Sequence, residues 1–498
     1  MLYIIFLPSG TSRHAQQPKA CARWHQREHS AAGVRHNRPV TDANPPSAPL
    51  FSSRRMLMNF VLLVLCSQFA FSVLAMKGVL LPQMLELWQI SKTQFGLLMT
   101  LYGVVHNVFY VALAWVQDRF SARTLIPINM ILGGLTTFFL GTTADFLTLC
   151  FLFIMLSLWC EGAFWPAVLA AVRKTTADEN QGKIFGLLEG GRGGVELLQN
   201  LLTIGLYTAL GYSVLGLEIA FKVNALIMIT LGVLAWRHLP KDTLLKAGTN
   251  ARLANREVNA GIKTVLRLPE VWLAGLVGFT VYLAYTAMPF FITYLTEVHA
   301  LAPLAVALFG IASTSGGRIG MALPSGFLAN RFFGGAVGAL RAGLAAVVLL
   351  ALTMVTLSAD RGDTWTALVT LTLMSLAFFF LRALYFAPYG EMGLPQRFSG
   401  SALAIAAFLI YLPSSFAYLL WGYVLDNQPG VRGYQFMFGV LACCALFGVA
   451  AATALRQRMR SGLRNRIKER IAAVDEQLGL LGQEKTLDGL IEQDSKEA

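Results

Sequence analysis

Seven ionisable side chains lie deep within long apolar runs of this sequence, where a charge is costly to bury. An ionisable residue in such a run usually faces a cavity or a partner of opposite charge, and it often marks the path of a substrate or a proton. These side chains are therefore the first candidates for a functional site. They are Lys77, Glu161, Glu189, Arg192, Glu196, Arg318 and Arg382.

Glu161 lies near the middle of its run, beside Phe164 and Trp165. Desolvation disfavours the charged form of a carboxyl group, so we expect Glu161 to exchange a proton near neutral pH. The alternative is a carboxylate that is permanently paired with Arg192 or Arg382. The first interpretation makes Glu161 a proton-coupling site, and the second makes it structural.

Arg382 occupies the position that an internal repeat relates to Glu161, and Tyr385 follows it by one helical turn. A guanidinium group grips carboxylate, sulfonate or phosphate with paired donors. We therefore expect Arg382 to bind the negative charge of a substrate, assisted by Tyr385 and by the further positive charge of Lys77. We expect His106, in another run, to be a satisfied interior histidine rather than a relay.

A single run contains Glu189, Arg192 and Glu196, and spacings of three and four place them on one helical face. One interpretation is a charge ladder that opens when a substrate or proton arrives. Arg192 and Arg318 would then join the substrate site, and Glu189 and Glu196 would be further proton-coupling candidates. The other interpretation is an internally neutralised ladder that serves packing alone.

The elements that must position these residues are about twelve apolar runs in a chain of 498 residues, 55% hydrophobic and 13% charged. A run of roughly 18 or more apolar residues can cross a bilayer as a helix. The third, ninth and twelfth runs hold almost no deep charge, which predicts two pseudo-symmetric six-helix bundles with the plain helices against lipid. The fold class is thus an all-α polytopic membrane protein. The runs are 57–81, 94–116, 125–142, 147–171, 183–209, 217–236, 272–294, 303–329, 335–357, 365–388, 399–423 and 434–455.

The net charge of +13 follows the rule that short cytoplasmic loops collect Lys and Arg, so it is not a nucleic-acid signal. The connections between successive apolar runs are alternately rich and poor in basic residues, which places both termini in the cytoplasm. We divide the chain into a disordered or mis-assigned extension (1–55), two bundles (56–236 and 271–455), a cytoplasmic linker (237–270) and a cytoplasmic tail with an amphipathic helix (456–498).

Similar short polar stretches follow the second run of each half. The first contains Asp118, Arg119 and Arg123, and its repeat contains Asn330 and Arg331. These residues are too far from the bilayer centre to bind a solute there. We expect them to act as gating residues, with Asp118 opposing the positive end of a helix dipole in the other half.

These stretches resemble the signature motif of the major facilitator superfamily, although Ala114 replaces its first glycine. The resemblance to the superfamily covers roughly residues 56–456. The sequence Glu161-Gly162-x-x-Trp165-Pro166-Ala167 is similar to the organic-anion and organophosphate branch. The resemblance implies solute transport by alternating access, often proton-coupled, with Glu161 as coupling site. The Asp-Arg pair that the branch often has in its first helix is absent here, and Lys77 lies one turn beyond the expected position. An Arg common in the seventh helix is also absent, which argues against a phosphate ester as the substrate.

The favoured function is a proton-coupled secondary transporter of a small organic anion in the inner or plasma membrane. Its expected partners are a small-molecule substrate, protons and the lipid bilayer, with no nucleic acid, and we expect a monomer. No ATP-binding loop or metal-ligand cluster is visible, so neither an enzyme nor a cofactor is expected. The alternatives are a carrier of a neutral or cationic solute, such as a sugar or drug exporter, and a non-transporting membrane receptor.

Overall fold

The computed structural model describes residues 51, 53–112, 120–175, 181–240, 266–322, 324–357, 363–392 and 396–461. All regular structure within these ranges is helical. The first half contains α1 (Arg54–Phe69), α2 (Ser72–Trp88), α3 (Lys92–Ala112), α5 (Ala122–Leu140), α6 (Phe146–Ser157), η1 (Leu158–Gly162), α7 (Phe164–Arg173), α8 (Gln181–Ala209) and α9 (Val214–His238).

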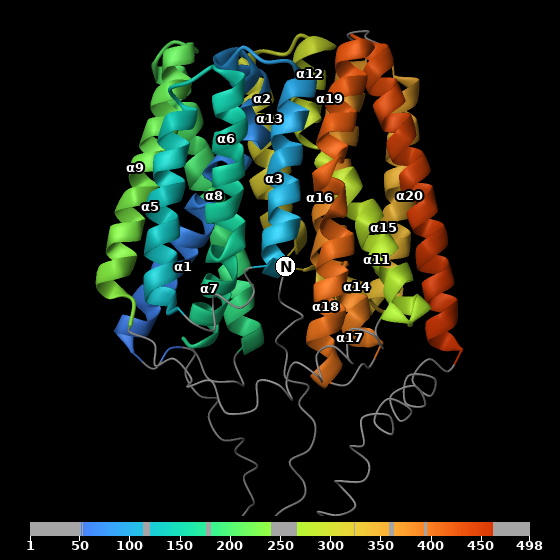
Figure 1. Cartoon of the computed structure of the whole chain (residues 1–498). Coiled ribbons are helices and arrows are strands. Elements are labelled where there is room, and N and C mark those ends of the chain that lie inside the picture. The colour runs from blue at the N-terminus through green and yellow to red at the C-terminus, as the bar shows by residue number, and fades with distance from the viewer. Residues whose placement is uncertain are drawn as a thin grey trace, which may run out of the picture.

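The second half repeats the pattern of long helices with interruptions. It contains α11 (Pro269–Thr286), α12 (Pro289–Glu297), α13 (Pro303–Ile311), η3 (Ala312–Gly316), η4 (Arg318–Ala322), α14 (Ser325–Phe333), α15 (Ala336–Thr356), α16 (Thr364–Leu384), α17 (Ala387–Glu391), α18 (Gln396–Tyr411), η6 (Leu412–Ser415), α19 (Ala417–Asn427) and α20 (Val431–Arg460). Figure 1 shows the blue-to-green helices of the first half beside the yellow-to-red helices of the second.

Nine helical segments among the described residues are long and apolar enough to cross a bilayer, and the pair α1 and α2, bent by 43°, makes a tenth. Helices α3 and α8 run beside them and are also long, with 21 and 29 residues. Helix α8 is long enough to cross a bilayer but less apolar than the other spans, and it carries Glu189, Arg192 and Glu196. Together these segments account for the twelve runs expected from the sequence.

Large apolar side chains cover the outer faces of the bundle. A water-soluble protein rarely exposes so continuous an apolar surface, whereas a bilayer accepts it, because each helix satisfies its own backbone hydrogen bonds. The most exposed of these side chains are Leu147, Leu198, Leu226, Trp236, Phe327, Phe332, Leu349 and Trp365.

Several spans break near their middle, where they approach the space between the halves. The chain leaves regular α-geometry at η1, at η3 and η4, between α16 and α17, and at η6. Non-helical backbone is tolerated at membrane depth where it lines a protein cavity, and single π-turns often occur at functional sites. The breaks therefore mark the walls of a cavity.

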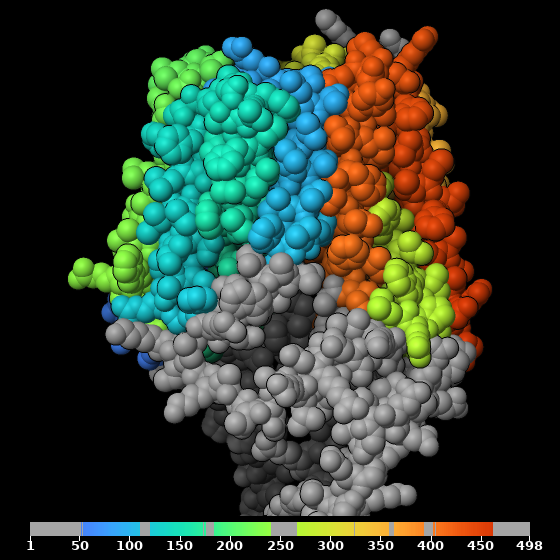
Figure 2. Space-filling view, viewed as in Figure 1, coloured from blue at the N-terminus to red at the C-terminus, as the bar shows by residue number. Residues whose placement is uncertain are grey.

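We call the end of the bundle where α1 begins and α20 ends the terminal end, and the opposite end the far end (Figure 1). At the far end α3 packs tightly against α19. A side chain at Gly96 would collide with the backbone of Tyr418 and Leu419, and one at Gly422 would collide with the backbone of Lys92. Glycine allows this close approach of helices, which closes the far end, as the joined blue and orange surfaces in the upper part of Figure 2 show.

The expected division of the chain into segments stays a prediction. Helix α1 begins at Arg54, and α20 ends at Arg460. Residues 1–50, most of the linker (241–265) and the tail beyond 461, including its expected amphipathic helix, lie outside the described residues.

Candidate functional site

A cavity of about 720 Å³ lies between the two halves. Its lining runs from the middle of the bundle, at Glu161 and Arg382, to the terminal end, at Asn330 and Glu391. Because the far end is closed, the cavity opens only toward the terminal end within the described part of the chain. A volume of this size suits a small-molecule ligand.

Glu161 lies in the π-helical segment η1, and its carboxylate points toward α3. It accepts a hydrogen bond from the Tyr102 hydroxyl at 3.2 Å, and His106 Nδ1 lies 3.3 Å from its other oxygen. The ring of His106 packs edge-on against Tyr411 of the second half, with centroids 5.1 Å apart. The partner of Glu161 is therefore His106 rather than Arg192 or Arg382, the partners considered from the sequence.

Arg192 is bound to its own helix. Its Nη1 lies 3.0 Å from Glu189 of the preceding turn, as the spacing predicts. The guanidinium also stacks over the ring of Trp165, 4.5 Å from the centroid, an attraction between a cation and the negative ring face. This part of the predicted ladder is internally neutralised.

Glu196 departs from the ladder because its partner comes from the other half. Arg318 in η4 donates to Glu196 at 2.5 Å and to the side-chain oxygen of Gln68 at 3.1 Å. Gly193 gives Arg318 room, because a Cβ there would meet the side chains of Ile319 and Arg318. One ion pair thus links the two halves inside the cavity.

Arg382 has different surroundings. Its guanidinium lies over the ring of Tyr285, 4.0 Å from the centroid, and 5.8 Å from that of Tyr282. Its Nη1 is buried and has no hydrogen-bond partner, and no carboxylate of the described ranges lies within ion-pair distance. A buried, unpaired guanidinium nitrogen at a cavity wall is the kind of unsatisfied group that calls for an explanation.

Among the lysines and arginines that line the cavity, Lys77 is the second without an acidic partner in the described part of the chain. Its Nζ donates to the hydroxyl of Tyr418 at 2.7 Å and lies 4.2 Å from the centre of that ring. Lys77 belongs to the first half and Tyr418 to the second. The two bases without a carboxylate therefore lie on opposite walls.

The remaining sequence-predicted residues lie elsewhere. Tyr385 is fully buried and outside the cavity lining, with its ring 5.0 Å from Phe386, so it supports the wall rather than forming it. Asn330 lines the cavity mouth, Arg331 is exposed beside it, and Arg123 Nε donates to the Trp236 carbonyl at 3.1 Å. Asp118 and Arg119 lie outside the described residues.

Sequence reasoning missed Tyr102, Gln68 and Tyr418, because polar but uncharged side chains carry little signal in an apolar run. It also underrated His106, which contacts Glu161 directly. The periodicity held a usable clue, since Tyr102 and His106 are four residues apart and share one face of α3.

Comparison with known proteins decides the family. The model of the Major Facilitator Superfamily matches residues 60–418, more than half of the chain. The chain belongs to the major facilitator superfamily. It is 26% identical over 426 residues to the inner membrane protein YihN of Escherichia coli, covering 83% of this chain and 97% of that protein. It is 23% identical over 368 residues to the inner membrane protein YqcE of the same organism, covering 72% and 84%.

Solved structures agree on the fold. The nucleoside transporter NupG superposes with a TM-score of 0.62 at 13% identity, covering 81% of this chain and 99% of that one. A bacterial homologue of the human lysosomal transporter Spinster, inward-facing and occupied, gives a TM-score of 0.62 at 12% identity, covering 81% and 96%. The predicted fold class is therefore confirmed. As a superfamily member, the protein is an integral membrane secondary transporter of a small molecule.

Proposed function

We propose that this superfamily member transports a small organic anion, such as a carboxylate or sulfonate, and couples its movement to protons. The observation that carries the proposal is the state of Arg382, a buried guanidinium at the cavity wall with a free Nη1 and no acidic partner among the described residues. The organic-anion branch of the superfamily is the assignment that this chemistry favours.

The pairing of the buried charges distinguishes this proposal from its main alternative, a carrier of neutral or cationic solutes. Arg192 pairs with Glu189 and Arg318 pairs with Glu196, whereas Glu161 contacts His106. A carrier of neutral or cationic solutes would need the third acid to neutralise Arg382. Because an unpaired buried charge is costly, the charge of Arg382 is best neutralised by a ligand that carries a negative charge.

The substrate would lie between the two walls. Arg382 supplies paired donors for the anion, and Lys77 adds a point charge from the opposite wall. Tyr282 and Tyr285 line the cavity beside Arg382, so they would contact the organic body of the substrate. Arg192 and Arg318 would attract the substrate less, because each is already paired with a carboxylate.

Glu161 is the proposed proton site, with Glu189 and Glu196 as the next candidates. Protonation would remove the charge that faces His106, and His106 packs on Tyr411 of the opposite half. The proton site is thereby in contact with the wall that carries Arg382. If a proton on Glu161 favours anion binding, then the anion must favour the proton by the same factor.

The orientation we propose puts the terminal end in the cytoplasm and the protein in the inner or plasma membrane. Basic residues gather at this end, as the positive-inside rule requires, and the relative YihN is an inner membrane protein. The cavity then opens to the cytoplasm, with Asp118, Arg119, Arg123, Asn330 and Arg331 as the inner gate. The basic residues described there include Arg54, Arg55, Lys174, Arg237, Arg341, Arg456 and Arg460.

The test is a ligand screen on purified protein followed by transport in liposomes. A ligand that binds the folded state raises its apparent thermal stability. We expect stabilisation by small carboxylates or sulfonates and none by neutral sugars, nucleosides or organic cations. Uptake of the best anion should then accelerate with an imposed pH gradient. Selective stabilisation by a neutral or cationic solute, with no competition from anions, would favour the rival carrier instead.

A further inference from the structure

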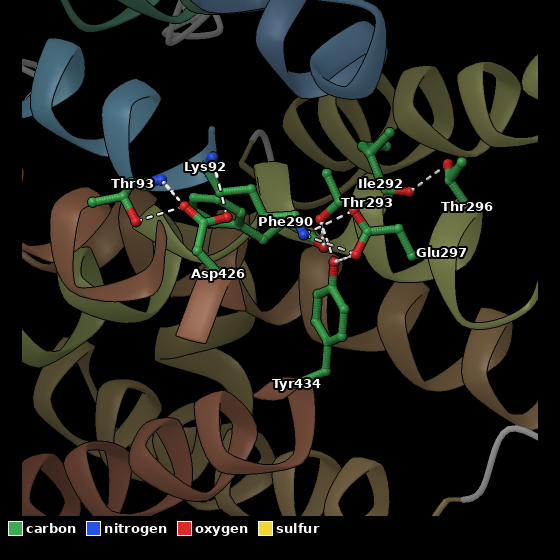
Figure 3. A network of polar contacts seen from close by, with 9 residues as sticks. All are labelled: Lys92, Thr93, Phe290, Ile292, Thr293, Thr296, Glu297, Asp426 and Tyr434. Carbon is green, nitrogen blue, oxygen red and sulfur yellow. Dashed lines mark hydrogen bonds and ion pairs between the residues drawn. The ribbon is translucent and has the colours of Figure 1, made fainter. Parts of the chain in front are cut away.

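A second polar cluster joins the halves at the far end, and Figure 3 shows its side chains. Lys92 at the start of α3 lies 2.8 Å from Glu297 at the end of α12, and Tyr434 of α20 donates to the same carboxylate at 2.9 Å. Lys92 belongs to the first half and the other two residues to the second. We call Lys92, Thr93, Glu297, Asp426 and Tyr434 the far-end cluster.

The second contact in the cluster is a helix cap that crosses between the halves. The Asp426 carboxylate, near the end of α19, accepts the Thr93 amide at 2.7 Å, the Thr93 hydroxyl at 2.6 Å and the Lys92 amide at 3.3 Å (Figure 3). The first amides of a helix have no partner within the helix, and their positive end attracts an anion. Asp426 therefore caps α3 although it belongs to another part of the chain.

The cap from Asp426 is additional to a local one. Ser91 Oγ accepts the Gln94 amide at 3.2 Å, and the Gln94 side chain accepts the Ser91 amide at 2.9 Å, which is a capping box. The start of α3 would thus remain a helix without Asp426. What the Asp426 contact adds is attachment of α3 to the second half.

Solvent reaches both the ion pair and the cap. The side chain of Glu297 is 39% exposed and Asp426 is exposed as well, and solvent weakens exposed ion pairs. Beneath the cluster, the buried rings of Phe95 and Phe290 meet across the two halves with centroids 6.5 Å apart. This apolar contact separates the polar cluster from the cavity.

We propose that Asp426 is the latch of the outer gate, and that its cap on α3 stabilises the conformation in which the far end is closed and the terminal end is open. When the far end opens, α3 and α19 separate and the Lys92 and Thr93 amides pass to water. Because the same two halves close the terminal end when the far end opens, loss of this cap shifts the population between the two states. The proposal concerns the conformational cycle and does not depend on the substrate or the proton.

The test is amide hydrogen exchange on the full-length protein in lipid nanodiscs without substrate, with Asp426→Asn compared to the unchanged chain. We expect exchange in the first turn of α3 to accelerate by about two- to fivefold, because asparagine keeps one acceptor oxygen but loses the negative charge that faces the helix dipole. We also expect the terminal-end rim, Ser325 to Phe333, to become more protected by a similar factor. The second change is the signature of a gate.

Asp145 offers a matched control. It caps α6 with the same geometry, accepting the Thr148 amide at 2.8 Å and hydroxyl at 2.6 Å, but within one half. These hydrogen bonds also lower the pKa of Asp145, so it is ionised at neutral pH as the comparison requires. Asp145→Asn should accelerate exchange at the start of α6 and leave the terminal-end rim unchanged.

A milder variant keeps the test decisive if Asp426→Asn fails to fold. Thr93→Val removes one donor to Asp426 without changing charge or shape, and it should produce a smaller shift in the same two regions. If either variant accelerates exchange only in the first turn of α3, Asp426 is a local cap and the gate proposal is wrong. An unchanged first turn would show that the cap is not occupied, which equally overturns it.

Discussion

The two mid-membrane positions related by the internal repeat, Glu161 and Arg382, have opposite surroundings. Glu161 is hydrogen-bonded by Tyr102 and faces His106, both from its own half. Arg382 is surrounded by aromatic faces and has a buried nitrogen with no hydrogen-bond partner. Of these two positions, Glu161 therefore has partners within its own half, whereas Arg382 keeps an unsatisfied guanidinium nitrogen.

This difference follows what each group can do chemically. A carboxyl group can change its charge by taking up a proton, so a site with its own partners can serve as a proton site. A guanidinium group cannot lose its proton in a protein, so only an added anion can neutralise it. We therefore propose that Glu161 takes up the proton and Arg382 binds the substrate anion, and variants at the two positions test this division.

The largest effect is expected from Arg382→Lys. A lysine keeps the charge but loses the paired donors, and hydrogen bonds to charged groups contribute about 1.5–3 kcal/mol. The affinity for the best organic anion should therefore fall by about ten- to a hundredfold, measured by ligand-induced thermal stabilisation or calorimetry.

Arg318→Lys is the control for this substitution, because Arg318 is already held by Glu196 and Gln68. It should reduce the yield or stability of the protein while leaving anion affinity within a few-fold. Normal affinity in Arg382→Lys, or an equal loss in both variants, would show that Arg382 does not hold the anion.

Glu161→Gln should separate binding from coupling. Glutamine is close in shape to a protonated glutamic acid and keeps an acceptor for Tyr102. We expect substrate binding and exchange to persist, while accumulation driven by a pH gradient disappears, as measured by uptake and counterflow in liposomes.

Glu189→Gln provides the comparison, since Glu189 is the ion-pair partner of Arg192. It should retain accumulation driven by the pH gradient. If Glu161→Gln still concentrates the substrate, Glu161 is not the proton site, and Glu189 and Glu196 become the groups to test.

A smaller effect is expected from Lys77→Met. The lysine is a point charge that Tyr418 already holds at 2.7 Å, so it contributes less than a guanidinium with a free nitrogen. Anion affinity should fall by about three- to tenfold, within the range of a single hydrogen bond. A loss as large as that of Arg382→Lys would mean that the two walls share the anion equally, and the division drawn above would need revision.

The sequence was sufficient to predict the fold. Membrane-spanning helices can be recognised by their length and apolar composition alone. The repeated polar stretches at Asp118 and Asn330 indicated the two halves. The bends at η1 and η4 were not predictable, since π-turns depend on how neighbouring helices pack rather than on local residue preference.

The charged side chains of the cavity lining were predicted by residue type but not by pairing. The rule that buried charges often mark function selected Glu161, Arg192, Arg318 and Arg382, which all line the cavity, and helical spacing predicted the Arg192 pair within α8. Spacing cannot reveal contacts between halves, so the partner of Arg318 was out of reach. The outer cap at Asp426 was missed for the same reason, because it joins residues more than three hundred positions apart.

The smallest effect is expected far from both walls, at the start of α1, and it sets the baseline for the comparison. Ser53 Oγ accepts the Met56 amide at 3.2 Å as an N-cap, and the ring of Phe51 lies 5.4 Å from that of Phe60. Loss of such a cap costs about 1 kcal/mol. Ser53→Ala should therefore lower the thermal unfolding midpoint slightly, with unchanged anion affinity and coupling.

Two truncations extend this baseline. Deletion of residues 1–50, which show no apolar periodicity, should leave membrane insertion and transport intact. Deletion of residues 1–55 also removes the Ser53 cap and the Phe51 contact, so it should reproduce or exceed the destabilisation of Ser53→Ala. A change in anion affinity or proton coupling in either truncation, with a constant midpoint of thermal unfolding, would mean that the start of the chain acts on the cavity. The two walls alone would then not determine binding and coupling.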